Sequence, residues 1–188
     1  MYMDWQRQIM EYSPYNEQEA ADRQVMLSCI NTFEDVLERS NAVAHVTCSG
    51  FVVNEERTKV LMVHHNIYNS WSSTGGHADG ETDFLAVALR EVEEETGVKG
   101  TPVTTDVFSL DVLTVVGHVK KGRYISPHLH LNAVYLIEAD EQQPLRIAEE
   151  ENSDVAWLPI GELDDYCKEE HMKPIYRKII EKMKALLK

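Results

Sequence analysis

The segment of residues 75–98 constrains the fold of this chain more than any other, because a glycine pair precedes a stretch with helical periodicity. If the chain is helical from about Asp83 onward, at about 100° per residue, then Glu91, Glu94 and Glu95 fall on one arc. A neighbouring arc is mostly apolar and carries Leu85, Ala88, Leu89, Val92 and Thr96. The pattern predicts a helix that packs on a sheet while its carboxylates face a cleft.

Three carboxylates that lie side by side repel one another unless a cation balances their charge. Mg²⁺ and Mn²⁺ are hard divalent cations that prefer oxygen ligands. Glu91, Glu94 and Glu95 are therefore the candidate metal ligands. A run of acidic residues is usually a solvated face. Here the glycines, Arg90 and the glutamates agree in register, which favours the metal site.

The same segment resembles the Nudix box, the signature of the Nudix hydrolase family. The residues that match at the family's spacing are Gly76, Arg90, Glu91, Val92, Glu94, Glu95, Gly97 and Val98. The family's early glutamate falls on Thr82 when it is counted from Gly76, and on Glu81 when it is counted from Gly75. Because this glutamate helps to hold the arginine in the family, the resemblance implies that Glu81 and Arg90 support the site. The alternative role for Arg90 is a phosphate clamp.

The resemblance implies metal-dependent hydrolysis of a nucleoside diphosphate linked to another group, with Mg²⁺ or Mn²⁺ as the cofactor. Glu91, Glu94 and Glu95 would be the metal ligands, together with a main-chain carbonyl at Gly75, and Glu91 and Glu94 would be catalytic. Family members take their catalytic base from the box or from a later loop, where Glu150 is the candidate in the run 149–151. Such a run is also typical of a solvated loop.

Four further side chains are candidates for substrate binding. Trp71 could stack on a nucleobase, and His77, directly after the glycine pair, could contact phosphate. His128 and His130 are separated by one residue, so in a strand they share one face and could line the cleft. Each has an ordinary alternative: the tryptophan fills the core under the loop, and the histidines are surface, hydrogen-bonded or core-edge residues.

Periodicity predicts helices and strands on both sides of the box helix. The expected helices are residues 3–12, 17–39, 161–168 and 174–188, and the expected strands are 44–54, 59–65, 103–116, 128–139 and 153–158. These elements indicate an α/β protein, and the resemblance implies a Nudix-type α/β/α sandwich with a mixed sheet. We expect an N-terminal helical extension over residues 1–41, followed by a Nudix hydrolase domain over residues 42–188 with a C-terminal helix.

Composition limits the partners. The chain has 188 residues, 43% of them apolar, with a formal net charge of -14 and a pI near 4.9. Such acidity argues against nucleic acid and anionic membranes as partners, and favours a small nucleotide-type diphosphate that is bound locally. The widely spaced Cys29, Cys48 and Cys167 fit reduced thiols, and no leader or membrane span is evident, so we expect a cytoplasmic protein.

Three functions are compatible with the pattern. The first is a pyrophosphohydrolase; the others are a catalytically inactive nucleotide sensor of the same fold and a diphosphate isomerase with a reactive cysteine. The sequence does not identify the substrate, because fold does not specify it. The N-terminal helices could cap the cleft or form a homodimer contact.

Overall fold

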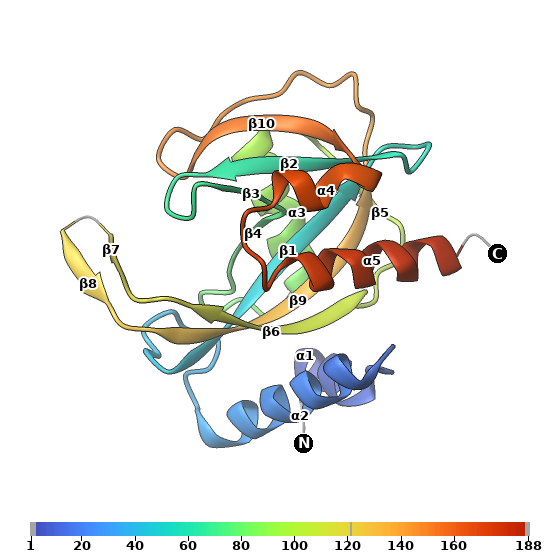
Figure 1. Ribbon diagram of the computed structural model, residues 1–188. Coiled ribbons are helices and arrows are strands. Elements are labelled where there is room, and N and C mark those ends of the chain that lie inside the picture. Colours follow the sequence, from blue (N-terminus) through green and yellow to red (C-terminus); the bar gives the residue numbers. More distant parts are fainter. Residues whose placement is uncertain (1–2, 121, 187–188) are drawn as a thin grey trace.

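A mixed sheet of eight strands forms the centre of the molecule in the computed structural model, which describes residues 3–120 and 122–186. The central pair, β1 (Ala44–Val53) and β9 (His128–Glu138), is parallel. The other strands of the sheet are β2 (Lys59–His65), β3 (Ser70–Ser72), β4 (Thr74–His77), β5 (Thr101–Pro102), β6 (Ser109–Val115) and β10 (Asn152–Pro159). A separate hairpin, β7 (His118–Lys120) and β8 (Arg123–Ile125), projects from one end of the sheet (Figure 1).

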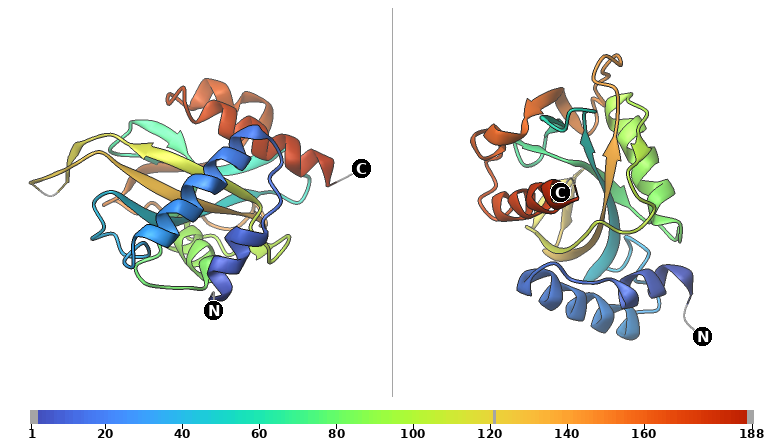
Figure 2. Two further views of the ribbon diagram at one scale, coloured as in Figure 1. Left: turned by 90° about the horizontal axis from the view of Figure 1, so that it is seen from below. Right: turned by 90° about the vertical axis from the view of Figure 1, so that its right-hand side faces the viewer.

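Helices cover both faces of this sheet. The helix α3 (Phe84–Thr96) lies on one face, and α4 (Leu163–Tyr166) and α5 (Lys173–Ala185) lie on the other (Figure 2). A single 3₁₀ turn, η1 (Ile160–Glu162), leads into α4. The N-terminal helices α1 (Asp4–Glu11) and α2 (Glu17–Thr32) lie beside each other near β6. The arrangement confirms the predicted α/β sandwich with its mixed sheet and N-terminal helical segment.

Alternation along the strands divides the core in two, because successive side chains point to opposite faces of a sheet. On β1, Val46, Cys48 and Val52 belong to the cluster that packs on α3, whereas Phe51 and Val53 belong to the cluster that packs on α5. All five side chains are buried. Along β1 and β9, alternate residues therefore face α3 and α5 in turn. On β1 the even-numbered residues face α3 and the odd-numbered residues face α5.

The predicted helix over residues 17–39 is too long, because α2 ends at Thr32. Phe33 adopts an extended backbone conformation, and the chain then turns so that the carbonyl of Val36 accepts a hydrogen bond from the amide of Val46. Val36 is buried in the core as a result. Burial of this side chain against the start of β1 outweighs the continuing helical pattern.

Two other predictions need correction. The expected strand over residues 103–116 is β6 alone, because Asp106 donates its amide to the Thr104 hydroxyl in a turn that separates β5 from β6. The basic stretch after β6, for which the sequence predicted no helix or strand, forms the β7–β8 hairpin, in which Gly122 has a φ of +77°. The terminal helix ends at Ala185, and the expected continuation over residues 187–188 lies outside the described residues.

The N-terminal helices are attached to the rest of the chain by a buried network around Glu19, whose side chain is fully buried. Its carboxylate accepts hydrogen bonds from Lys182 (2.8 Å), Tyr12 (2.7 Å) and Ser109 (3.0 Å), and it lies 3.2 Å from Lys178. The network joins α2 to β6 and α5. Whether residues 1–41 form an extension distinct from a domain over residues 42–188 stays a prediction, and residues 1, 2, 187 and 188 lie outside the described part.

Within the ranges 3–120 and 122–186, no helix combines the length and the apolar character that are needed to cross a membrane.

Candidate active site

The ends of α3 are set by its own sequence. The Asp83 side chain accepts a hydrogen bond from the amide of Ala86 (3.0 Å), which caps the first turn. At the other end, Gly97 takes a left-handed conformation with a φ of +78°, which glycine adopts without strain. These caps fix the length and the rotation of the helix, and with them the positions of its carboxylates.

Glu91 lies directly against the glycine strand β4. A Cβ atom added at Gly76 would collide with the Glu91 carboxyl group. Only glycine leaves room for this approach. Burial, followed by the charge of Glu94, raises the pKa of Glu91 to about 7. A bound cation would balance the charge of a carboxylate in this position.

Glu95 is the most buried of the three carboxylates, with 5% of its surface exposed. Its carboxylate accepts a hydrogen bond from the amide of Gly75 (3.0 Å), and Asn152 donates to its main-chain carbonyl (3.1 Å). Burial raises its pKa to about 8, although the Gly75 amide opposes this shift. The glycine pair therefore contacts both inner carboxylates of the helix.

Glu94 is the outer member of the set, and 61% of its side chain is exposed. Arg90 lies between it and the loop: it donates to Glu81 at 2.6 Å and lies 3.8 Å from the Glu94 carboxylate. The bond to Glu81 is the main cause of a raised pKa for Arg90. The three carboxylates on the predicted arc thus differ in exposure, from the buried Glu95 to the exposed Glu94.

The acidic loop after β9 lies near these carboxylates. The charge of Glu151 contributes to the raised pKa of both Glu91 and Glu95. Glu151 therefore has an electrostatic contact with the site. From the sequence, the run over residues 149–151 was expected to supply the catalytic base, with Glu150 as the candidate. That role of Glu150 stays a prediction.

The donor set fits hard divalent cations. It consists of carboxylate oxygens, two of them desolvated with raised pKa values, beside glycines that leave the loop backbone accessible. Mg²⁺ and Mn²⁺ prefer such oxygen ligands, and either would supply the missing positive charge. Glu91, Glu94 and Glu95, with the carbonyl of Gly75, are the residues that would hold them.

The predicted substrate-binding residues lie on the other face of the sheet. Trp71 is half-buried on β3, packs against the α5-side core and stands edge-on to His64 with ring centroids 5.5 Å apart. His130 pairs with His45 in the β1–β9 register. Both histidines stand at the alternate positions of their strands whose side chains face α5. His77 and His128 lie close to the same pair, with ring centroids 5.0 and 4.8 Å from His45.

His45 was not among the residues that the sequence singled out. Its only signal was its alternation with Thr47 and Ser49 on a predicted strand. The parallel pairing of β1 with β9, which brings it opposite His130, cannot be read from the sequence. The histidines therefore form a group of their own, separated by the sheet from the carboxylates of α3.

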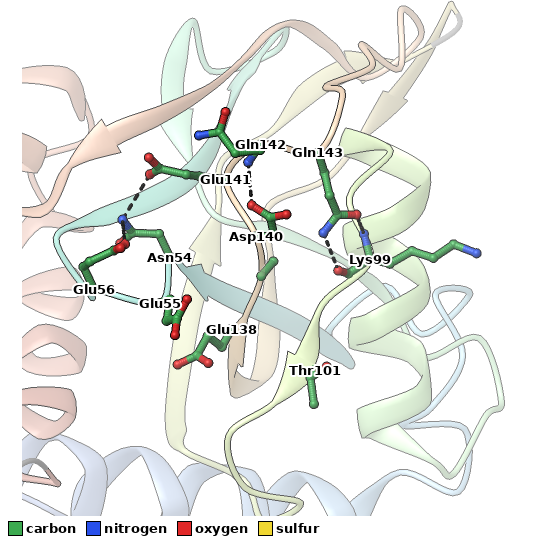
Figure 3. Close-up of a pocket in the computed structure, with 11 residues that line it drawn as sticks. Asn54, Glu55, Glu56, Lys99, Thr101, Glu138, Asp140, Glu141, Gln142 and Gln143 are labelled. Atoms are coloured by element: carbon green, nitrogen blue, oxygen red, sulfur yellow. Dashed lines mark hydrogen bonds between the residues drawn. The ribbon is translucent and has the colours of Figure 1, made fainter.

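A groove of about 470 Å³ lies at the carboxyl ends of β1 and β9 (Figure 3). Its lining includes five carboxylates and one lysine: Glu55, Glu56, Glu138, Asp140, Glu141 and Lys99. A negatively charged polyphosphate would be repelled there. The groove includes none of the predicted site residues, so we do not assign the substrate to it.

Replacing Gly76 with alanine is expected to push the Glu91 carboxyl group aside, because the added Cβ would collide with it. Glu91 is a flexible side chain, so we expect little loss of stability but roughly tenfold weaker Mn²⁺ binding, by analogy with disturbed supports of other metal ligands. Isothermal titration with Mn²⁺ measures the change. The control is Gly161→Ala, where a Cβ meets no atom of the described chain within 4 Å. Equal Mn²⁺ affinity in Gly76→Ala and wild type would contradict the assignment of Glu91.

Comparisons with known proteins agree with this geometry. A family model described as the NUDIX domain matches residues 44–183. An RNA pyrophosphohydrolase from Pelagibacter ubique is 24% identical over 144 residues, which cover 73% of this chain and 90% of that protein. Nucleoside diphosphate-linked moiety X motif 6 from Xenopus laevis is 41% identical over 59 residues, or 30% of this chain and 27% of that protein.

Solved structures show the same fold. An Ap4A hydrolase from C. elegans, crystallised as a binary complex, is similar with a TM-score of 0.54 and 16% identity, covering 76% of this chain and 96% of that chain. A NUDIX-family hydrolase from Clostridium perfringens has a TM-score of 0.54 and 19% identity, covering 77% and 98%. The match of the family model, over residues 44–183, includes the whole of α3 and of β4.

Proposed function

The chain belongs to the NUDIX family of hydrolases, and on this premise we propose that it is a metal-dependent pyrophosphohydrolase. Its substrate would be a nucleoside diphosphate linked to another group. The observation that carries the proposal is the set of Glu91, Glu94 and Glu95 on α3, two of which are desolvated beside Gly75 and Gly76. When bound, Mg²⁺ or Mn²⁺ would neutralise diphosphate charge and lower the pKa of an attacking water.

The chain's own residues would prepare the site for this chemistry. The Gly75 amide orients Glu95, and the absence of a side chain at Gly76 lets Glu91 approach the loop. The Glu81–Arg90 ion pair would hold the arginine beside the outer carboxylate. A glutamate of the loop over residues 149–151 would accept the proton of the attacking water, and Glu151 of this loop is in electrostatic contact with Glu91 and Glu95.

Two observations weigh against the alternatives. A nucleotide sensor would not need an intact ligand set, yet all three box carboxylates are present in register. A diphosphate isomerase would need a reactive thiol, yet Cys48 is fully buried and burial raises its thiol pKa well above its usual range. Both support hydrolysis over the other two functions.

The substrate class is a separate proposal. The Pelagibacter ubique relative is named for RNA, and the C. elegans structure for Ap4A. A net charge of -14 disfavours binding along an RNA strand but leaves the 5′ end of an RNA accessible to a local site. We propose a small nucleotide diphosphate as the substrate and treat the RNA 5′ end as the competing outcome.

A hydrolysis panel tests the function. Purified protein with Mg²⁺ or Mn²⁺ would be given a dinucleoside tetraphosphate, ADP-ribose, a nucleotide sugar, a dinucleotide coenzyme, an oxidised nucleoside triphosphate and a 5′-triphosphorylated RNA, with products separated by chromatography. We expect cleavage of a phosphoric anhydride bond in at least one small nucleotide. Tight binding of a panel member without turnover would replace the enzyme with the sensor, and cleavage of RNA alone would overturn the substrate proposal.

A further inference from the structure

Histidines from three strands converge on the sheet face opposite α3. His45 on β1 lies opposite His130 on β9, and His128 is two residues earlier on the same strand. His77 on β4 flanks the group, with ring centroids 5.0 Å from His45 and 5.1 Å from His130. One ring nitrogen from each of His45, His128 and His130 lies within 4.8 Å of the other two.

Backbone carbonyls orient two of these rings. The Nδ1 atom of His45 lies 2.8 Å from the carbonyl oxygen of Asn41, and Nδ1 of His128 lies 2.8 Å from that of Ser126. A carbonyl can only accept, so Nδ1 carries the proton in both rings and Nε2 carries the lone pair, which in His128 lies 3.3 Å from Nε2 of His130. Metal-binding histidines are held in this way, with the second nitrogen donating to a carbonyl.

The Nε2 atom of His45 has no hydrogen-bond partner among the described residues, and the side chain is 97% buried, since 3% of the residue is exposed. A buried lone pair without a donor costs free energy. The ring is directed at the group formed by the other histidines, with centroids 4.8 Å from His128 and 5.0 Å from His130. The unused acceptor therefore points to a ligand.

The spacing between His128 and His130 suits a shared ion. Their Nε2 atoms are 3.3 Å apart. Two nitrogens bound tetrahedrally to zinc at about 2.0–2.1 Å are separated by about 3.3–3.4 Å. The three ligand atoms lie within 4.8 Å of one another, so small side-chain movements would bring all three to one ion while the strands stay in register.

Burial favours the neutral form of the His45 and His130 rings, which is the form that binds metal. Burial lowers the pKa of His45, and burial followed by the neighbouring His77 lowers that of His130 to about 2. Arg39, the nearby cation, is held in a two-pronged ion pair by Asp79, so much of its charge is balanced.

We propose that His45, His128 and His130 form a binding site for a divalent transition metal of the zinc type, distinct from the carboxylate site on α3. Imidazole nitrogens suit Zn²⁺, whereas carboxylates and water suit Mg²⁺ and Mn²⁺. The two sites lie on opposite sides of the sheet and offer different donor atoms, so we expect them to take different ions. Three histidines leave a fourth position for water or for an oxygen of a ligand.

The test measures metal binding and is independent of hydrolysis. Untagged, chelator-treated protein would be titrated with Zn²⁺ by calorimetry and with Co²⁺ by visible spectroscopy, where nitrogen ligands in four-coordinate geometry give intense d–d bands. The variants are His45→Gln, His128→Gln and His130→Gln. Glu94→Gln removes one ligand of the carboxylate site, and His171→Gln controls for an exposed histidine, 57% of whose side chain is accessible.

Wild type, Glu94→Gln and His171→Gln are expected to bind one Zn²⁺ and to give the intense Co²⁺ bands. Loss of one ligand should weaken Zn²⁺ binding by at least the roughly 10–100-fold that loss of an outer-shell partner costs, and should abolish the bands. His128 is only half-buried, so His128→Gln decides the matter if the variant of buried His45 fails to fold. Zn²⁺ affinity in His128→Gln equal to wild type, or weak octahedral Co²⁺ bands in wild type, would overturn the proposal.

Discussion

Glu94→Gln is expected to lower kcat by roughly 100-fold or more, because it removes the charge of a metal ligand while keeping the shape of the side chain. The side chain is 61% exposed, and its ion pair with Arg90 is long, at 3.8 Å. Its loss should therefore leave the fold intact. Steady-state kinetics on the substrate found in the panel, together with a thermal unfolding curve, measures both effects.

The matched control is Glu93→Gln on the same helix. Glu93 is exposed and pairs with Lys99 at 3.3 Å, and it lies off the carboxylate arc. The same change of charge and shape should leave kcat within about twofold of wild type, as is usual for an exposed ion pair. If both variants lose activity equally, the effect is one of overall charge, and the assignment of Glu94 is wrong.

Glu19→Gln is expected to lower the free energy of unfolding by about 3–5 kcal/mol, the usual cost of removing one partner from a buried ion pair. The carboxylate is fully buried and accepts hydrogen bonds from Tyr12 and Lys182. A glutamine leaves Lys182 and Lys178 with less compensation for their burial. Urea unfolding at pH 7 gives the difference, and Glu17→Gln, an exposed residue in the first turn of the same helix, is the control.

The pH dependence of this difference is a second check. Although burial acts in the opposite direction, bonds from Lys182 and Tyr12 lower the pKa of Glu19 from 4.5 to about 2 in the folded state. The charged network therefore contributes fully above pH 4.5 and is lost as the pH falls through 2. The gap between wild type and Glu19→Gln should be largest at pH 7 and should shrink between these values. A gap that stays constant down to pH 2 would contradict the network.

The box helix could be predicted from the sequence because its information is local. Asp83, the helical period of the carboxylates and Gly97 lie within fifteen residues, and the structure has the helix at Phe84–Thr96. The contact between Glu91 and Gly76 follows from the return of the helix onto the strand before it. Local patterns of this kind specify most of the secondary structure.

The histidine group could not be predicted because it depends on pairing between distant segments. His45 and His130 meet through the parallel register of β1 with β9, across more than eighty residues. The helical period of the sequence also could not predict that Glu95 is buried. Its contacts with the amide of Gly75 and with Asn152 on β10 come from the tertiary structure. Tertiary pairing also determined where α2 ends, at the turn that buries Val36.

The cation dependence of hydrolysis tests the central claim most directly. Protein freed of metal with a chelator would be assayed on its nucleotide substrate before and after addition of Mg²⁺ or Mn²⁺. The carboxylates of α3 predict no turnover without the cation, full recovery on its return and no recovery in Glu94→Gln. Turnover that survives chelation, or that a divalent cation restores equally in Glu94→Gln, would contradict the account.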